Sequence, residues 1–135
     1  MIINRNNQNI IDTGEICFHD LFITSFVFNP QEKEIGIIVS DSHSDLFCVK
    51  LINVFDFLYT NRYPYKVKVN NMIYGWEEIP NEYTKDYFLE DVRNSFINSG
   101  GKWNDEIFAV RFLLVNMSEI KIICEEIYID IMTTN

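Results

Sequence analysis

The sequence predicts a mainly β fold, an antiparallel β-sandwich of about eight strands with one helix, over about residues 84–98, ahead of the C-terminal hairpin. Three observations predict it: apolar β-prone runs alternate with polar turns, one segment has clear helical spacing, and the longest β pattern ends the chain. An α+β roll is the alternative that fits the same pattern. A chain of 135 residues with 47% hydrophobic side chains can bury one core, so we expect a single domain over residues 1–135.

The first half of the chain contains three strand patterns. They follow a polar, asparagine-rich start at residues 1–14, where we expect a loose or edge-paired segment. Turns separate the strands, because Asn29-Pro30 starts a turn readily and the 40–45 loop is polar throughout. In the third strand the odd-numbered apolar residues are the better core candidates. The three predicted strands cover residues 16–28, 35–40 and 46–58.

The middle of the chain predicts a small hairpin followed by the helix. Residues 66–69 alternate lysine and valine like an edge strand, and Asn70-Asn71 would turn into a strand at 72–76. The helix has an N-cap at Thr84 and Gly100-Gly101 after its last turn. Its apolar residues, at helical spacing, are Phe88, Leu89, Val92 and Phe96.

The C-terminal hairpin carries the strongest β pattern. Residues 108–115 are apolar at nearly every position, which predicts a central strand covered on both faces. After a polar turn at 116–119, the apolar residues of the second strand change from even to odd positions. The even set is Ile120, Ile122 and Cys124, and the odd set is Ile127, Ile129 and Ile131. Side chains alternate faces with a period of two, so we expect a bulge or bend at Glu125-Glu126, as where a strand passes between sheets.

Composition restricts the classes of function. The net charge of −9 disfavours binding to nucleic acid or to an anionic membrane, and it favours a basic partner or simple solubility. The sequence shows neither a secretory signal nor an apolar stretch of bilayer length, so we expect a cytoplasmic protein that does not bind membranes. An odd number of cysteines without metal-type spacing predicts reduced, largely buried thiols, and we expect no cofactor. The cysteines are Cys17, Cys48 and Cys124.

Residues 59–87 are rich in tyrosine and contain Trp76, beside charges of both signs. Amphipathic aromatic side chains of this kind are typical of protein interfaces, and similar platforms bind sugars. The competing interpretation is that Trp76 and several tyrosines cover the core beneath the helix. The candidate partner-binding residues of this segment are Tyr63, Tyr65, Tyr74, Trp76, Glu77 and Glu78.

A second candidate surface, near the final strand, is acidic. If its carboxylates are exposed together, they would attract the cationic surface of a toxin or nuclease. A solvated outer face explains them equally well. The adjacent pair Glu125-Glu126 does not predict a glycosidase, because neighbours on a strand point to opposite faces. The acidic set is Glu119, Glu125, Glu126 and Asp130, and the last three are candidate partner-binding residues.

Two further clusters contain residue types that can act in catalysis or bind a metal ion. The 40–45 loop holds His43 beside Asp41 and Asp45, which are residue types that serve acid-base catalysis or bind a cation. A hairpin loop favours the same types, and their spacing matches no calcium or zinc motif. A metal site can also be drawn from cysteine and histidine side chains, although it would need three strands to converge. Its ligands would be Cys17, His19 and Cys124.

Three stretches carry a resemblance. His19-Asp20 precedes a strand, Trp76-Glu77-Glu78-Ile79 lies in the middle, and a strand over residues 120–127 follows near the end. Together they resemble small uncharacterised β-sandwich proteins of low-GC Gram-positive bacteria, which include predicted immunity proteins of polymorphic toxin systems. The resemblance implies a cytoplasmic protein that binds and blocks a cognate toxin without being an enzyme. It assigns no functional residues.

The sequence therefore favours a non-enzymatic protein-binding domain, and an immunity protein that blocks a basic toxin is its specific form. The alternative is a small-ligand or carbohydrate-binding β-sandwich that uses Trp76 and the nearby tyrosines, which requires those rings to be exposed in a groove. A hydrolase built on the 40–45 loop comes third. It requires an ordered pair of His43 with a carboxylate in a deep pocket.

Overall fold

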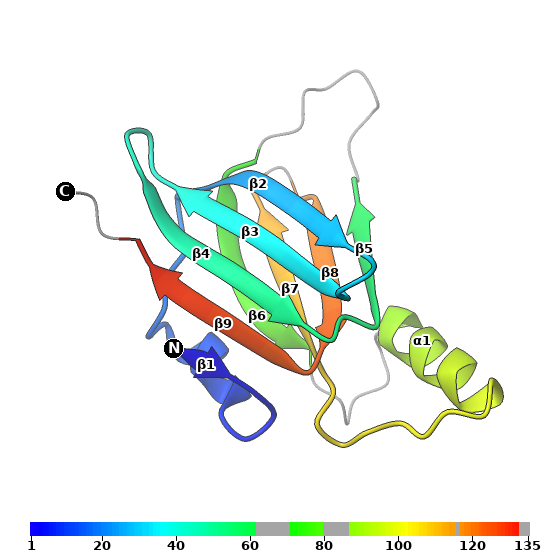
Figure 1. The fold of residues 1–135 in the computed structure, drawn as a ribbon. Helices are drawn as coiled ribbons and strands as arrows, with labels where there is room; N and C mark the ends of the chain where they lie inside the picture. Colours follow the sequence, from blue (N-terminus) through cyan, green and yellow to red (C-terminus); the bar gives the residue numbers. More distant parts are fainter. Residues whose placement is uncertain (62–70, 80–86, 116, 133–135) are drawn as a thin grey trace.

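The computed structural model describes residues 1–61, 71–79, 87–115 and 117–132. The β-sandwich prediction is confirmed: in the described residues nine strands form two antiparallel sheets, and one α-helix lies beside the second sheet (Figure 1). No helix in this part of the chain is long and apolar enough to cross a membrane.

The first sheet has five strands and the second has four. In spatial order, the first sheet consists of β1 (Ile2–Ile3), β9 (Glu126–Ile131), β4 (Asp45–Ile52), β3 (Glu34–Ser40) and β2 (Phe22–Asn29). The second consists of β5 (Asp56–Thr60), β8 (Glu119–Cys124), β7 (Phe108–Leu114) and β6 (Ile73–Ile79). The chain also forms a 3₁₀ helix, η1 (Gln8–Thr13), and the α-helix α1 (Tyr87–Asn98).

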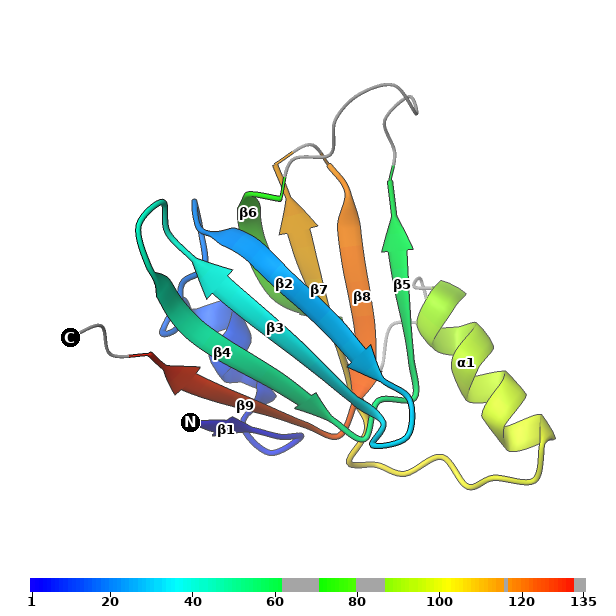
Figure 2. The same cartoon turned by 45° about the horizontal axis from the view of Figure 1, so that its top comes forward.

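The two sheets face each other and enclose the main core between them (Figure 2). Period-two alternation turns the apolar side chains of each strand toward the opposite sheet, where they are removed from water. Rings from the loop before β2 and from β7 meet at the centre. Fully buried members of this core include Phe18, Ile35, Ile37, Leu51, Phe108, Phe112 and Ile122.

The C-terminal hairpin holds the two sheets together. As predicted, β7 is an interior strand, paired with β8 on one side and β6 on the other. The expected bend is confirmed at Glu125, because β8 belongs to the second sheet and β9 to the first. Ile122 and Ile127 both reach the main core despite their opposite parity. Ile131 is the exception, because it lies at the strand end and is 73% exposed.

The predicted strand over 46–58 is wrong in one respect, because it is two strands in different sheets. The chain leaves β4 through Asn53, whose φ of 52° is the left-handed conformation that asparagine tolerates, and enters β5 in the second sheet. Odd-numbered apolar side chains face the main core both in β4 and in β5. The period-two pattern of the sequence therefore shows no break at the crossing. Phe55 differs, since it packs against a second, smaller buried cluster beneath helix α1.

The predicted strand over 16–28 begins later than expected, at Phe22. Asp20 has a φ of 66°, which interrupts an extended chain, and a register shift between Ile23 and Ser25 changes the parity of the core-facing residues. Val27 is therefore 60% exposed. Cys17 precedes the strand and is exposed, contrary to the expectation of a buried thiol, whereas Cys48 is half-buried and Cys124 is buried.

The start of the chain was expected to be either loose or paired at a sheet edge, and it is paired at an edge. Strand β1 pairs with β9, and the N-terminal amino group of Met1 donates to the Ile129 carbonyl oxygen at 2.9 Å. Helix η1 was not predicted from the sequence; it packs beside β6 and buries Ile11.

Helix α1 covers one end of the second sheet's outer face. The predicted start at Thr84 lies outside the described residues, as do the predicted edge strand at 66–69 and the first residue of its turn, Asn70. The strand at 72–76 is confirmed within β6. The helix ends before Gly100, whose φ is 90°. Beneath it lies a second buried cluster of Ile79, Leu89, Ile107, Ala109 and Ile123.

Core side chains on both sides of the crossing at Glu125 should contribute to stability. Ile122→Ala and Ile127→Ala each remove a fully buried side chain, and we expect each to lower the free energy of unfolding by about 2–4 kcal/mol. Tyr128→Ala is the control, because that side chain is 40% exposed, and should cost about 1 kcal/mol or less. Urea denaturation measures all three. An Ile127→Ala cost no larger than that of Tyr128→Ala would show that the odd-numbered set does not face the core.

Candidate protein-binding surfaces

The structure distributes the predicted partner-binding residues over several places. Tyr63 and Tyr65 lie outside the described residues. Tyr74 and Glu77 lie on the outer face of the second sheet, whereas Glu125 and Glu126 lie at the crossing from β8 to β9.

Trp76 is a core residue and does not offer its ring to a partner. It is 8% exposed, its ring lies 4.9 Å from that of Phe18 and 5.7 Å from that of Phe112, and its Nε1–H donates to the Ile16 carbonyl oxygen at 3.0 Å. A register shift between Ile73 and Gly75 lets residues 73 and 76 both face inward. The glycine inside the strand pattern is the sequence signal of this bulge.

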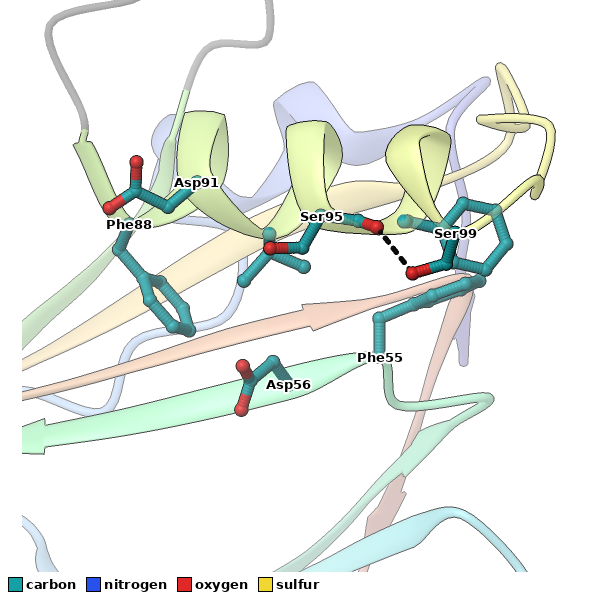
Figure 3. A pocket seen from close by; sticks show the side chains of 8 residues that line it. Phe55, Asp56, Phe88, Asp91, Ser95 and Ser99 are labelled. Atoms are coloured by element: carbon teal, nitrogen blue, oxygen red, sulfur yellow. Dashed lines mark hydrogen bonds between the residues drawn. The ribbon is translucent and has the colours of Figure 1, made fainter.

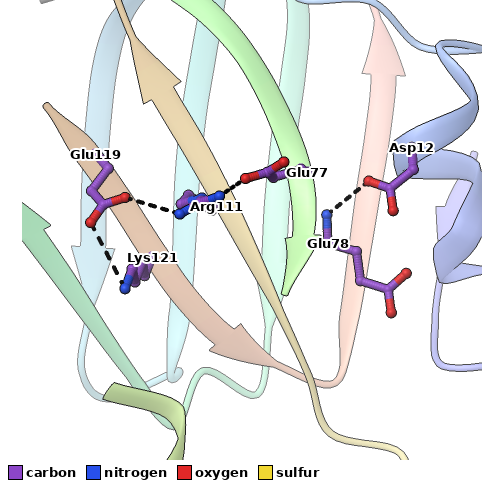
Figure 4. A network of polar contacts seen from close by, with 6 residues as sticks. All are labelled: Asp12, Glu77, Glu78, Arg111, Glu119 and Lys121. Atoms are coloured by element: carbon purple, nitrogen blue, oxygen red, sulfur yellow. Dashed lines mark hydrogen bonds and ion pairs between the residues drawn. The ribbon is translucent and has the colours of Figure 1, made fainter. Parts of the chain in front are cut away.

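A row of paired charges crosses the outer face of the second sheet (Figure 4). Arg111 on β7 lies opposite Glu77 of β6 and Lys121 of β8 in the strand register. Its guanidinium pairs with Glu77 through Nη2 and with Glu119 through Nη1, the latter at 3.5 Å. Lys121 Nζ lies 3.8 Å from the other Glu119 oxygen. Glu119 is only 4% exposed, so two cations surround a buried carboxylate.

Exposed apolar side chains border this row where the β7–β8 hairpin turns. Tyr74, Val115 and Met117 are 62%, 44% and 65% exposed, and the ring centroids of Tyr74 and His19 lie 5.8 Å apart in a T-shaped arrangement. They border a cavity of about 340 Å³ whose polar wall is formed by Arg111 and Glu119. We call the set of Tyr74, Glu77, Arg111, Leu113, Val115, Met117 and Glu119 the hairpin-end surface.

Glu78 lies at the edge of the second sheet beside η1, apart from the hairpin-end surface. Its backbone N–H donates to the Asp12 carboxylate at 3.1 Å. Partial burial raises the pKa of the Glu78 carboxyl, and the negative charge of Asp12 raises it further, while Arg5 opposes the change. Through the backbone bond to Asp12, Glu78 helps to hold η1 against β6.

The acidic residues near the last strand gather only in part. Glu125 and Glu126 line a cavity of about 440 Å³, together with Asp105 and Glu106 from the turn before β7 and with Arg5. We call this the acidic cavity. Side-chain amides of two asparagines hold the Glu125 carboxylate: Asn53 at 3.1 Å and Asn104 at 3.4 Å.

The other two members of the predicted acidic set lie elsewhere. Asp130 is exposed on β9 opposite Cys48, on the outer face of the first sheet, and Glu119 belongs to the row of paired charges. Sequence reasoning missed Asp105 and Glu106, because a turn carries no periodic signal that places it beside a strand crossing.

The 40–45 loop is organised by its own hydrogen bonds. Asp41 Oδ1 accepts from the backbone N–H groups of His43 and Ser44, both at 2.7 Å, and these bonds lower the pKa of the Asp41 carboxyl. The hydroxyl of Ser40 donates to Asp45 at 2.5 Å. Both carboxylates are thus engaged in shaping the hairpin loop.

The metal site drawn from the sequence does not assemble. Within the described residues, no group of three His, Cys, Asp or Glu side chains is placed to hold a metal ion. Cys17 and His19 are exposed before β2, whereas Cys124 is buried in β8, where burial raises the pKa of its thiol.

No protein-family model matches the chain, and no curated protein matches it. The resemblance to predicted immunity proteins therefore rests on the residues quoted for it.

The row of paired charges should contribute to the stability of the fold. Arg111→Met removes the guanidinium that pairs with the buried Glu119 carboxylate, and we expect the free energy of unfolding to fall by about 1–3 kcal/mol. Lys50→Met, the matched control, breaks the more exposed pair with Glu34 and should cost about 0.5 kcal/mol or less. Urea denaturation of both variants makes the comparison. Equal costs would contradict a structural role for the Arg111 pairs.

Proposed function

We propose that this chain is a non-enzymatic binding domain that docks a protein partner on the hairpin-end surface. The observation that carries the proposal is the exposed apolar border of Tyr74, Val115 and Met117 around the ion-paired Arg111. Tyrosine, methionine and arginine are enriched in protein interfaces, and tyrosine and arginine are frequent hot spots. Contiguous exposed apolar side chains on a small protein mark interaction sites more often than isolated ones do.

The paired charges prepare this surface for binding. Arg111 is held by carboxylates on both neighbouring strands, so its side chain loses little conformational freedom when a partner arrives. The flanking Tyr74 ring is braced by His19. A partner that covers this area would remove apolar side chains from water without having to order the charged centre first.

Charge favours a basic partner. The chain carries a net charge of −9, and the acidic cavity adds a concentrated negative region at the crossing from β8 to β9. Such a field accelerates encounter with a cationic protein and disfavours an acidic one. An immunity protein that blocks a basic toxin, the class that the sequence resembles, is the specific form of the proposal. The carbohydrate-binding alternative has less support, because Trp76 lies in the core.

Binding to the protein encoded beside this gene tests the proposal. We expect the purified pair to associate with a dissociation constant below about 1 μM and co-expression to protect cells from the partner. The double variant Tyr74→Ala/Met117→Ala should weaken binding about thirtyfold, which corresponds to about 2 kcal/mol, because two exposed apolar contacts are lost. Isothermal titration calorimetry gives the affinities.

The control is Val27→Ala, because Val27 is as exposed as Tyr74 but lies on the first sheet. It should leave the affinity unchanged. Absence of binding at micromolar concentration would contradict the proposed partner, and equal binding by the double variant would contradict the proposed surface.

A further inference from the structure

A groove of about 470 Å³ runs between helix α1 and strand β5 (Figure 3). Helix residues at spacings of three and four form one wall, and the start of β5 forms the other. Phe88 lies at one end of the groove and Phe55 at the other, with Asp56 between them (Figure 3). None of these residues belongs to the hairpin-end surface.

Strand β5 is an edge strand beside this groove. In the described part of the chain it pairs with β8 alone, and its Leu58 and Tyr59 side chains are 41% and 45% exposed. An edge strand presents backbone N–H and C=O groups that a further strand can bind. The Phe57 N–H donates to the Asp56 carboxylate at 2.8 Å, so a side chain of the same strand takes the place that a neighbouring strand's carbonyl would fill.

The groove has the apolar and acidic lining that an extended, basic segment requires. Its apolar lining consists of Phe55, Phe88, Val92 and Phe96, against which alternate side chains of an added strand can pack. Its described lining contains the carboxylates of Asp56 and Asp91 and no basic side chain. Lysine or arginine in the bound segment would therefore be complementary to it.

We infer that this groove binds an extended peptide segment of a partner protein, which adds to β5 as a further strand and carries apolar residues together with a lysine or arginine. A carbonyl of the segment replaces Asp56 as the acceptor of the Phe57 N–H. The released Asp56 carboxylate then pairs with the basic side chain, and Asp91 adds to the attraction. The inference goes beyond the hairpin-end surface, and neither depends on the other.

Selection from random peptides of about ten residues, the length of a long strand, tests the inference on the full chain. We expect the selected sequences to alternate apolar residues and to contain lysine or arginine. Ser95→Trp fills the groove from an exposed position and should weaken a selected synthetic peptide about tenfold or more. Asn94→Trp, the same change one residue away and outside the groove lining, should leave its affinity unchanged.

Two further measurements do not depend on the tryptophan variants. Peptide binding should slow hydrogen exchange of the Phe57 amide, because a strand then covers it. Asp56→Asn should weaken the peptide at low salt and by a smaller factor at high salt, because ions screen the lost attraction. The inference is overturned if no peptide is enriched above a blank selection or if Ser95→Trp and Asn94→Trp bind alike. It is also overturned if sedimentation shows a dimer that Ser95→Trp dissociates, because the occupant is then a second copy of the chain.

Discussion

The period-two alternation of a strand, applied to a chain that changes sheets twice, determines this structure. At Asn53 the chain passes from the first sheet to the second, and at Glu125 it passes back. Each crossing must deliver apolar side chains to the same core from the opposite side. Because β4, β5, β8 and β9 are connected in this way, the two sheets share the main core, and its rings belong to both.

The same arrangement produces the surfaces that we propose as binding sites. The second sheet has an outer face that helix α1 covers at one end, which leaves the row of paired charges and its apolar border at the other. Even at that end, the helix does not cover the sheet completely, because the groove remains between α1 and β5. The crossing at Glu125 brings the last strand beside the turn that holds Asp105 and Glu106, and this juxtaposition creates the acidic cavity. The proposed binding features thus lie at a sheet edge, at a crossing between the sheets and where the helix covers its sheet only in part.

What the sequence predicted depends on whether a structural event changes the alternation pattern. The crossing at Glu125 changes the parity of the apolar residues, so it was visible, whereas the crossing at Asn53 preserves parity and was not. Asn53 itself was the available signal, because asparagine within a strand pattern tolerates a positive φ. The sequence left Trp76 open between a binding residue and a core residue, and the bulge at Gly75 places it in the core. Charged residues of the candidate surfaces were found singly, and their partners across strands were not, since register is a tertiary property.

The most direct measurement of the shared core is the reactivity of the Cys124 thiol, which is buried where β8 turns toward β9. In a variant carrying Cys17→Ser and Cys48→Ser, a thiol reagent under native conditions reports the free energy needed to expose Cys124. If the two sheets are stable only together, this free energy equals that of global unfolding measured with urea. A value several kcal/mol lower would mean that the sheets separate while each stays folded, and it would contradict the shared core.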